Sequence, residues 1–82
     1  MRIIKFVAKW CHKCKLFSKT PCDLEVDIDL PSYAKTLVKY QVSIVPTFVA
    51  LDDRGRVIGK LSNPMDIEAV ENWRSKLGKK GK

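Results

Sequence analysis

Two cysteines separated by two residues carry the clearest chemical signal in this chain of 82 residues. Cys11 and Cys14 lie in the segment Trp-Cys-His-Lys-Cys-Lys, after a short apolar run and at the start of a run of helix formers. A cysteine at the start of a helix faces unpaired backbone N–H groups, which favour thiolate over thiol. The thiolate is the form that attacks a disulfide. We therefore expect Cys11 to be the attacking thiolate and Cys14 the resolving thiol.

Positive charge close to the first cysteine should act in the same direction. Lys9, His12 and Lys13 stand within two residues of Cys11, and neighbouring cations favour a thiolate. A pair of buried cysteines without function is the competing interpretation, but packing seldom places two cysteines at this spacing on a strand-to-helix turn. The third cysteine, Cys22, is expected to be an inert thiol, with a redox-sensitive or intermolecular thiol as the alternatives.

A proline at the start of a strand is the second informative feature. The segment 44–48 reads Ile-Val-Pro-Thr-Phe, and proline, which lacks an N–H, fits only the first residue or an edge of a strand. If the Val45–Pro46 bond is cis, the backbone before it would turn toward the Cys11 loop. Only about 5–6% of such bonds are cis in folded proteins, so the proline alone does not establish this.

The pattern of apolar residues predicts an α/β fold with the order β-α-β-α-β-β-α. Strands are expected at residues 2–8, 24–28, 47–51 and 56–61, and helices at 11–19, at 30–38 and from 63 through 77. Asn63 should cap the last helix with Pro64 at its first position, and Met65, Ala69, Val70, Trp73 and Leu77 should form its apolar side. A right-handed crossover makes the first two strands parallel, and a turn with Gly55 makes the last two a hairpin. These elements predict a four-stranded mixed sheet with three flanking helices.

Composition and charge narrow the class of protein. Apolar residues make up 45% of the chain, and we expect residues 1–78 to form one domain followed by a basic tail, 79–82. The net charge is +7, but the lysines and arginines are spread along the chain without interleaved aromatics, which favours a solvated surface over nucleic-acid binding. The first apolar run is too short for a signal peptide or a membrane span. With an odd number of cysteines, these features predict a cytoplasmic protein.

Several motifs together resemble the thioredoxins. They are Trp-Cys-x-x-Cys-Lys at 10–15, Asp-Ile-Asp at 27–29, Ile-Val-Pro-Thr at 44–47 and Gly55, and the resemblance covers residues 3–77. It implies a thioredoxin-like fold, a cis Val45–Pro46 bond, and backbone groups of Val45 that hydrogen-bond an extended substrate. It also implies that Trp10 shields a redox-active disulfide, which needs no other cofactor. The activity implied is reduction of protein disulfides by the Cys11–Cys14 dithiol.

The sequence also departs from that family. It lacks the usual N-terminal strand and helix, so we expect a minimal form closer in size to glutaredoxins. The spacer His-Lys replaces Gly-Pro, which should make the disulfide more oxidising. Lys5 stands where thioredoxins have a buried acid, and Glu25 stands where they have a lysine. We hypothesise that Lys5 and Glu25 form a charge-swapped pair in which Glu25 accepts the proton of Cys14. The alternative is that both residues are exposed on opposite edges of the sheet. Asn63 replaces a glycine near the substrate groove. Catalysis is thus assigned to Cys11, Cys14, Lys5 and Glu25, and substrate binding to Trp10, His12, Val45, Pro46 and Asn63.

Other interpretations remain open at this point. Glutaredoxins carry a Gly-Gly pair before the last helix that residues 61–66 lack, which disfavours glutathione use, although Asp66 and the many lysines keep it open. A zinc site from Cys11, His12, Cys14 and Cys22 is disfavoured because adjacent Cys11 and His12 do not easily face one metal. The expected partners are protein disulfides, with ribonucleotide reductase as one acceptor by resemblance only, and a thioredoxin-reductase-type or glutathione recycling system. The protein is expected to be a monomer.

Overall fold

The computed structural model describes residues 1–80. Four strands, two α-helices and two short 3-10 helices follow one another along the chain. In order they are β1 (Arg2–Val7), η1 (Lys13–Phe17), β2 (Leu24–Asp27), η2 (Pro31–Tyr33), α1 (Ala34–Lys39), β3 (Thr47–Leu51), β4 (Val57–Ser62) and α2 (Ile67–Lys80). Among these residues, no helix is long and apolar enough to span a membrane.

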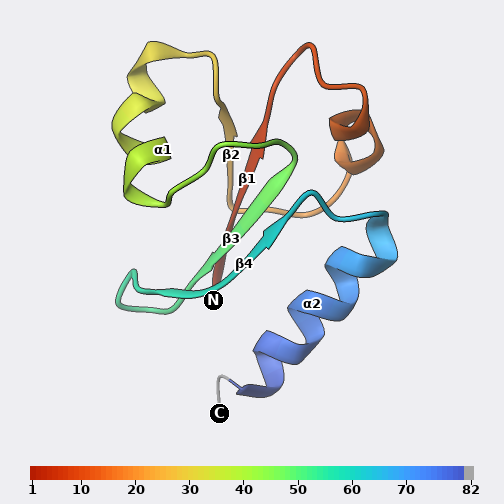
Figure 1. Ribbon diagram of the computed structural model, residues 1–82. Helices are drawn as coiled ribbons and strands as arrows, with labels where there is room; N and C mark the ends of the chain where they lie inside the picture. Colours follow the sequence, from red (N-terminus) through yellow and green to blue (C-terminus); the bar gives the residue numbers. More distant parts are fainter. Residues whose placement is uncertain (81–82) are drawn as a thin grey trace.

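The strands form one mixed sheet in the order β2-β1-β3-β4 (Figure 1). β1 is parallel to β2 and antiparallel to β3, and β4 pairs antiparallel with β3. The predicted four-stranded mixed sheet is therefore confirmed. Gly55 has a φ of 80° in the turn of the β3–β4 hairpin, a conformation that costs glycine little because it lacks a Cβ.

The two α-helices cover opposite faces of the sheet. Successive side chains of a strand point to opposite faces, so the apolar central strands need cover on both sides. Ile3 and Phe48 point to the face that packs against α2, together with Val70 and Leu77. Ile4 and Val49 point to the other face, where the α1 side chains pack. Both central strands are thus buried on both sides, and loops connect the strands at the two ends of the sheet (Figure 1). The redox cysteines follow the end of β1.

The expectation of three flanking helices is wrong, because the segment predicted as a helix over residues 11–19 forms only the 3-10 helix η1. Its backbone bonds span three residues, as from the Lys15 N–H to the His12 carbonyl at 3.1 Å. Few residues separate Cys11 from Pro21, and a proline cannot continue a helix, so a longer one does not propagate. The Phe17 carbonyl also accepts a hydrogen bond from Lys5 Nζ at 2.8 Å.

The predicted start of the last helix is also wrong. Asn63 is not its cap: it has a φ of 51° in a loop, and α2 begins at Ile67. Asp66 acts as the cap, since its Oδ1 accepts the Ala69 N–H at 2.9 Å. Met65 is 80% exposed and so lies outside the apolar side. The helix runs to Lys80, two residues into the expected tail, and residues 81–82 of that tail lie outside the described residues.

Candidate active site

Cys11 and Cys14 form a disulfide at the connection between β1 and η1, and their Cα atoms are 5.3 Å apart. Both residues are more than nine-tenths buried. The Cys14 backbone N–H points at Cys11 Sγ, with a nitrogen–sulfur distance of 3.2 Å. A hydrogen bond donated to sulfur favours its charged form, so this N–H is placed to favour a thiolate at Cys11 once the disulfide is reduced.

The proline segment lies against the disulfide. The Val45–Pro46 peptide bond is cis, and Val45 packs against the cluster formed by Cys11, Cys14 and Ala8. Thr47 anchors the segment because its Oγ1 donates a hydrogen bond of 2.7 Å to the Ile44 carbonyl. Within residues 1–80, the backbone N–H and C=O of Val45 have no hydrogen-bond partner, which leaves both groups available beside the cysteines.

Trp10 stands beside the disulfide with an exposed ring. Its side chain is 64% exposed, and its Nε1–H donates to Asp29 Oδ2 at 2.8 Å. The Asp29 N–H in turn donates to Asp27 Oδ1 at 2.9 Å. Asp29 belongs to the Asp-Ile-Asp motif of the sequence. Its distance along the chain from Trp10 does not identify Asp29 as the partner of the indole.

Lys5 and Glu25 do form a pair. They are register partners on parallel strands, so their side chains share one face, and Lys5 Nζ lies 3.4 Å from Glu25 Oε1. The Lys5 side chain is 3% exposed and that of Glu25 is 56% exposed. The alternative of two exposed residues on opposite edges is therefore wrong. Glu25 also lines a hollow of about 390 Å³ together with Cys11 and Cys14, so a carboxylate shares this hollow with the redox pair.

Asn63 connects two parts of the site that are far apart in sequence. Its backbone N–H donates to the Pro46 carbonyl at 2.8 Å, and its Oδ1 accepts from Lys13 Nζ at 2.9 Å. Lys13 belongs to the spacer between the cysteines, and the other spacer residue, His12, is exposed. From the sequence, Lys13 is recognisable only as a charge near Cys11, because a contact between residues fifty positions apart leaves no local pattern.

Cys22 lies apart from the redox pair. It is half-buried and free, and it packs against the cluster around Phe17 and Val70 rather than the one that holds Cys11 and Cys14. Within residues 1–80, no three His, Cys, Asp or Glu side chains are grouped to hold a metal ion. The four ligands considered for zinc are thus not brought together.

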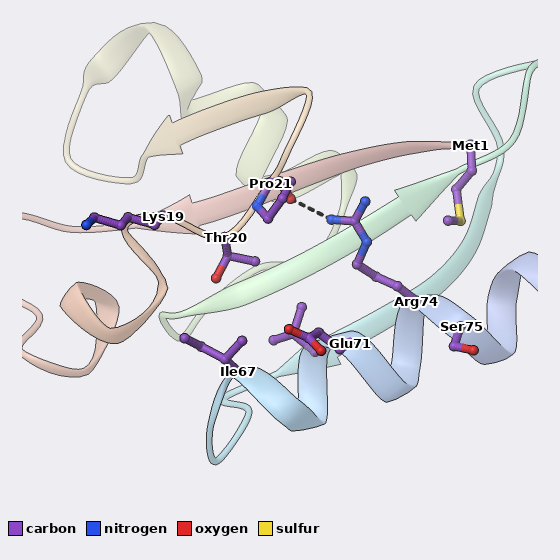
Figure 2. A pocket seen from close by; sticks show the side chains of 9 residues that line it. Met1, Lys19, Thr20, Pro21, Ile67, Glu71, Arg74 and Ser75 are labelled. Carbon is purple, nitrogen blue, oxygen red and sulfur yellow. Dashed lines mark hydrogen bonds between the residues drawn. The ribbon is translucent and has the colours of Figure 1, made fainter.

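A larger hollow, of about 520 Å³, lies elsewhere on the molecule (Figure 2). It separates α2 from the segment that follows η1, and Arg74 bridges the two with a hydrogen bond of 2.6 Å to the Pro21 carbonyl. Neither redox cysteine lines it. We therefore place the candidate site at the smaller hollow beside the disulfide, where the reactive atoms are.

Comparison with known proteins supports this fold. No protein-family model matches the sequence, and no curated protein has a statistically significant match to it. Among solved structures, the thioredoxin pre-protein of Schistosoma mansoni is 28% identical with a TM-score of 0.73, over 92% of this chain and 76% of that one. Thioredoxin O1 of Arabidopsis thaliana is 23% identical with a TM-score of 0.72, over 90% and 74% of the two chains. Thioredoxin 1 of Thermosipho africanus is 22% identical with a TM-score of 0.72, and the match covers both chains entirely. The chain therefore has a thioredoxin-like α/β fold and resembles the thioredoxins, with a Cys11–Cys14 disulfide consistent with a CxxC-type active site.

Proposed function

We propose that this protein is a thiol–disulfide oxidoreductase whose Cys11–Cys14 dithiol reduces protein disulfides. The observation that carries the proposal is the hydrogen bond from the Cys14 N–H to Cys11 Sγ, beside a cis-proline segment. This arrangement supports a nucleophilic sulfur at Cys11, since it favours the thiolate that thiol–disulfide exchange requires. The likeness to thioredoxin structures supports the same class of reaction.

The reaction proceeds in two exchanges. The Cys11 thiolate attacks one sulfur of the substrate disulfide, that S–S bond breaks, and the departing substrate thiolate takes a proton from solvent. This leaves a mixed disulfide between Cys11 and the substrate. Cys14 then loses its proton and attacks Cys11 Sγ, which releases the second substrate thiol and forms the Cys11–Cys14 disulfide. Two electrons pass from the protein to the substrate.

The residues around the pair have distinct roles in this scheme. Val45 offers its free N–H and C=O to an extended substrate strand, as in recognition by strand addition, and Pro46 holds that backbone beside Cys11. Trp10, fixed by Asp29, shields one side of the disulfide. His12 lies in the spacer and is exposed, so its side chain is available to a bound substrate.

Glu25 is proposed as the proton acceptor for Cys14. A general base must reach the proton that it accepts, directly or through one water, and the hollow shared by Glu25 and Cys14 provides room for a water relay. Lys5 acts as a positioning residue, because its buried ammonium lies beside the Glu25 carboxylate and holds it on the sheet face that the two residues share.

We place this activity in the cytoplasm of its cell, in a monomer that carries no cofactor beyond the disulfide. Oxidised protein would be recycled by a thioredoxin-reductase-type enzyme or by glutathione. Ribonucleotide reductase is a candidate acceptor on the basis of the family resemblance.

The proposal is tested by following reduction of a protein disulfide with the wild type and three cysteine variants. Cys11→Ser should be inactive, and Cys14→Ser should accumulate a one-to-one mixed disulfide that mass spectrometry detects. Cys22→Ser serves as the matched control and should keep full activity. Activity in Cys11→Ser equal to that of the wild type would refute the assignment.

A further inference from the structure

Lys13 has an ammonium group held at the boundary between the disulfide loop and the proline segment. Its side chain is half-buried, and Asn63 Oδ1 accepts one of its protons at 2.9 Å. Asn63 is itself fixed, since its N–H donates to the Pro46 carbonyl at 2.8 Å. An ammonium has three donors, so this contact leaves two for another group.

Several lysines lie beside the disulfide without an ion-pair partner. Lys9, Lys13 and Lys15 flank the cysteines, and none of them forms an ion pair in the described part of the chain. The carboxylates near the site each already face a cation or accept a hydrogen bond. Glu25 faces Lys5, Asp27 accepts from the Asp29 N–H, Asp29 accepts from Trp10, and Asp66 caps α2.

We propose that Lys13, positioned by Asn63, binds a carboxylate of the substrate next to the disulfide that is reduced, so that the preferred substrates are disulfides flanked by acidic residues. The inference rests on the proposed function. A substrate strand that pairs with Val45 passes the Pro46–Asn63 contact, where the two free donors of Lys13 are available. Lys9 and Lys15 add attraction at longer range, which raises the rate of encounter.

The expected size of the effect follows from the exposure of the site. A single partly exposed ion pair changes an equilibrium by up to about fivefold. Salt screens such an interaction, because the Debye length falls from about 30 Å at 0.01 M to about 3 Å at 1 M ionic strength. The preference for acidic substrates should therefore be largest in dilute buffer.

Two disulfide peptides test the proposal, identical except for Glu or Gln on either side of each half-cystine. We expect wild-type kcat/KM for the Glu peptide to exceed that for the Gln peptide about fivefold in dilute buffer, and the two to converge in high salt. Lys13→Met should remove most of the preference and leave only the smaller part that Lys9 and Lys15 contribute, whereas Lys13→Arg, which keeps the charge, should preserve most of it. Asn63→Ala should lower the ratio without changing the overall charge. Lys76→Met, at an exposed lysine of α2, is the matched control and should leave the ratio unchanged.

The ratio separates this inference from the proposed function. Equal wild-type rates with the two peptides, or a full preference retained by Lys13→Met, would overturn the role of Lys13. A full preference retained by Asn63→Ala would overturn the positioning role of Asn63. If the wild type reduced neither peptide, nor any protein disulfide, the proposed function itself would fail.

Discussion

Lys5 Nζ lies 3.4 Å from Glu25 Oε1 and donates a 2.8 Å hydrogen bond to the Phe17 carbonyl. One buried ammonium thereby joins the edge strand β2 to the end of η1, the short helix that contains Cys14. A buried charge is tolerated only with such partners. The pair thus links the position of Glu25 to that of the redox cysteines.

Glu25→Gln should slow the resolution of a mixed disulfide by about tenfold or more, because the amide does not accept the proton of Cys14. The measurement is the rate at which a preformed mixed disulfide between Cys11 and a small thiol decays, followed by tryptophan fluorescence. Glu71→Gln, at an exposed glutamate of α2 away from the disulfide, should resolve at the wild-type rate. An unchanged rate in Glu25→Gln would remove its proposed role.

The ion pair should contribute only modestly to stability, because the Glu25 side chain is 56% exposed. A double-mutant cycle with Lys5→Met and Glu25→Gln, measured by urea unfolding, should give a coupling free energy of about 0.2–1 kcal/mol. Lys5→Met alone should cost more, about 1–3 kcal/mol, since it also leaves the Phe17 carbonyl without its side-chain donor. Additive single variants would show that the two charges do not interact in solution.

Thr20→Val should stabilise the protein. Within residues 1–80, Thr20 Oγ1 is buried without a hydrogen-bond partner, and a methyl group of similar size removes that unpaired hydroxyl. The expected gain is about 1 kcal/mol, which corresponds to a rise in Tm of about 4–8 °C for a domain of this size. Thr20→Ser, which keeps the hydroxyl, should show no gain. A lower Tm for Thr20→Val would indicate that the hydroxyl has a partner in solution.

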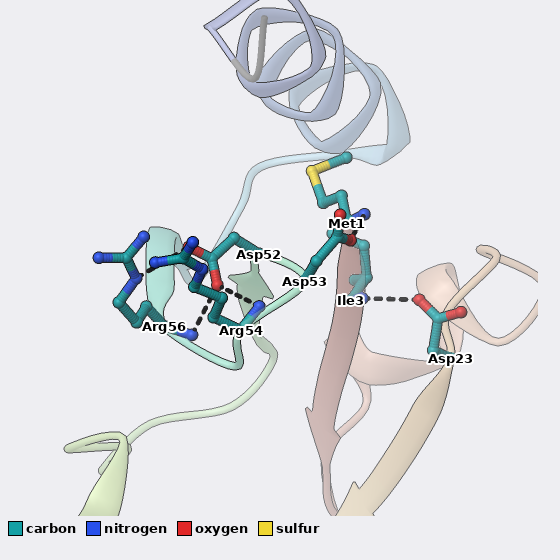
Figure 3. A network of polar contacts seen from close by, with 7 residues as sticks. All are labelled: Met1, Ile3, Asp23, Asp52, Asp53, Arg54 and Arg56. Atoms are coloured by element: carbon teal, nitrogen blue, oxygen red, sulfur yellow. Dashed lines mark hydrogen bonds and ion pairs between the residues drawn. The ribbon is translucent and has the colours of Figure 1, made fainter.

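Asp52 should make the β3–β4 turn sensitive to acid (Figure 3). Its Oδ1 accepts the backbone N–H groups of Arg54 and Arg56, each at 2.9 Å. The Arg56 backbone N–H, more than any other group, holds the pKa of Asp52 below its ordinary value of 3.8. A depressed folded-state pKa stabilises the protein fully above the unfolded-state pKa, and this stabilisation is lost as the pH falls through the folded-state value.

Wild type should therefore exceed Asp52→Asn in stability at neutral pH, and the difference should shrink below about pH 4. Urea midpoints across that pH range measure it. Asp53→Asn, which removes the neighbouring, fully exposed carboxylate, is the control variant. A difference that stayed constant with pH would contradict the link to the Asp52 carboxylate.

The sheet could be predicted because its signals are local. Ile3 and Phe48 belong to short β-favouring runs, and the turn at Gly55 lies between two such runs, so the parallel first pair and the hairpin follow from general rules. The helices were less predictable. Residues 11–19 contain good helix formers, but Pro21 leaves too little length. Asn63 and Pro64 match the preferences of a helix start, yet the contacts of Asn63 with Pro46 and Lys13 hold it in the preceding loop.

The site was predictable where two residues share a sequence motif or a strand register. Cys11 and Cys14 are three positions apart, and Lys5 and Glu25 face each other because β1 and β2 are parallel. The Lys13–Asn63 contact has no such signal. It arises only when the last strand returns beside the proline segment, so it follows from the tertiary structure alone.

The measurement that tests the central claim most directly is an equilibrium redox titration of the Cys11–Cys14 pair in the intact protein, followed by tryptophan fluorescence against a dithiol buffer. We predict one reversible two-electron transition at about −270 to −180 mV, between the potentials of reducing and isomerising members of the redox-active class. Loss of the transition in Cys11→Ser, with Cys22→Ser unchanged, would assign it to this pair. A wild-type protein with no reversible transition would contradict the proposal that it is a thiol–disulfide oxidoreductase.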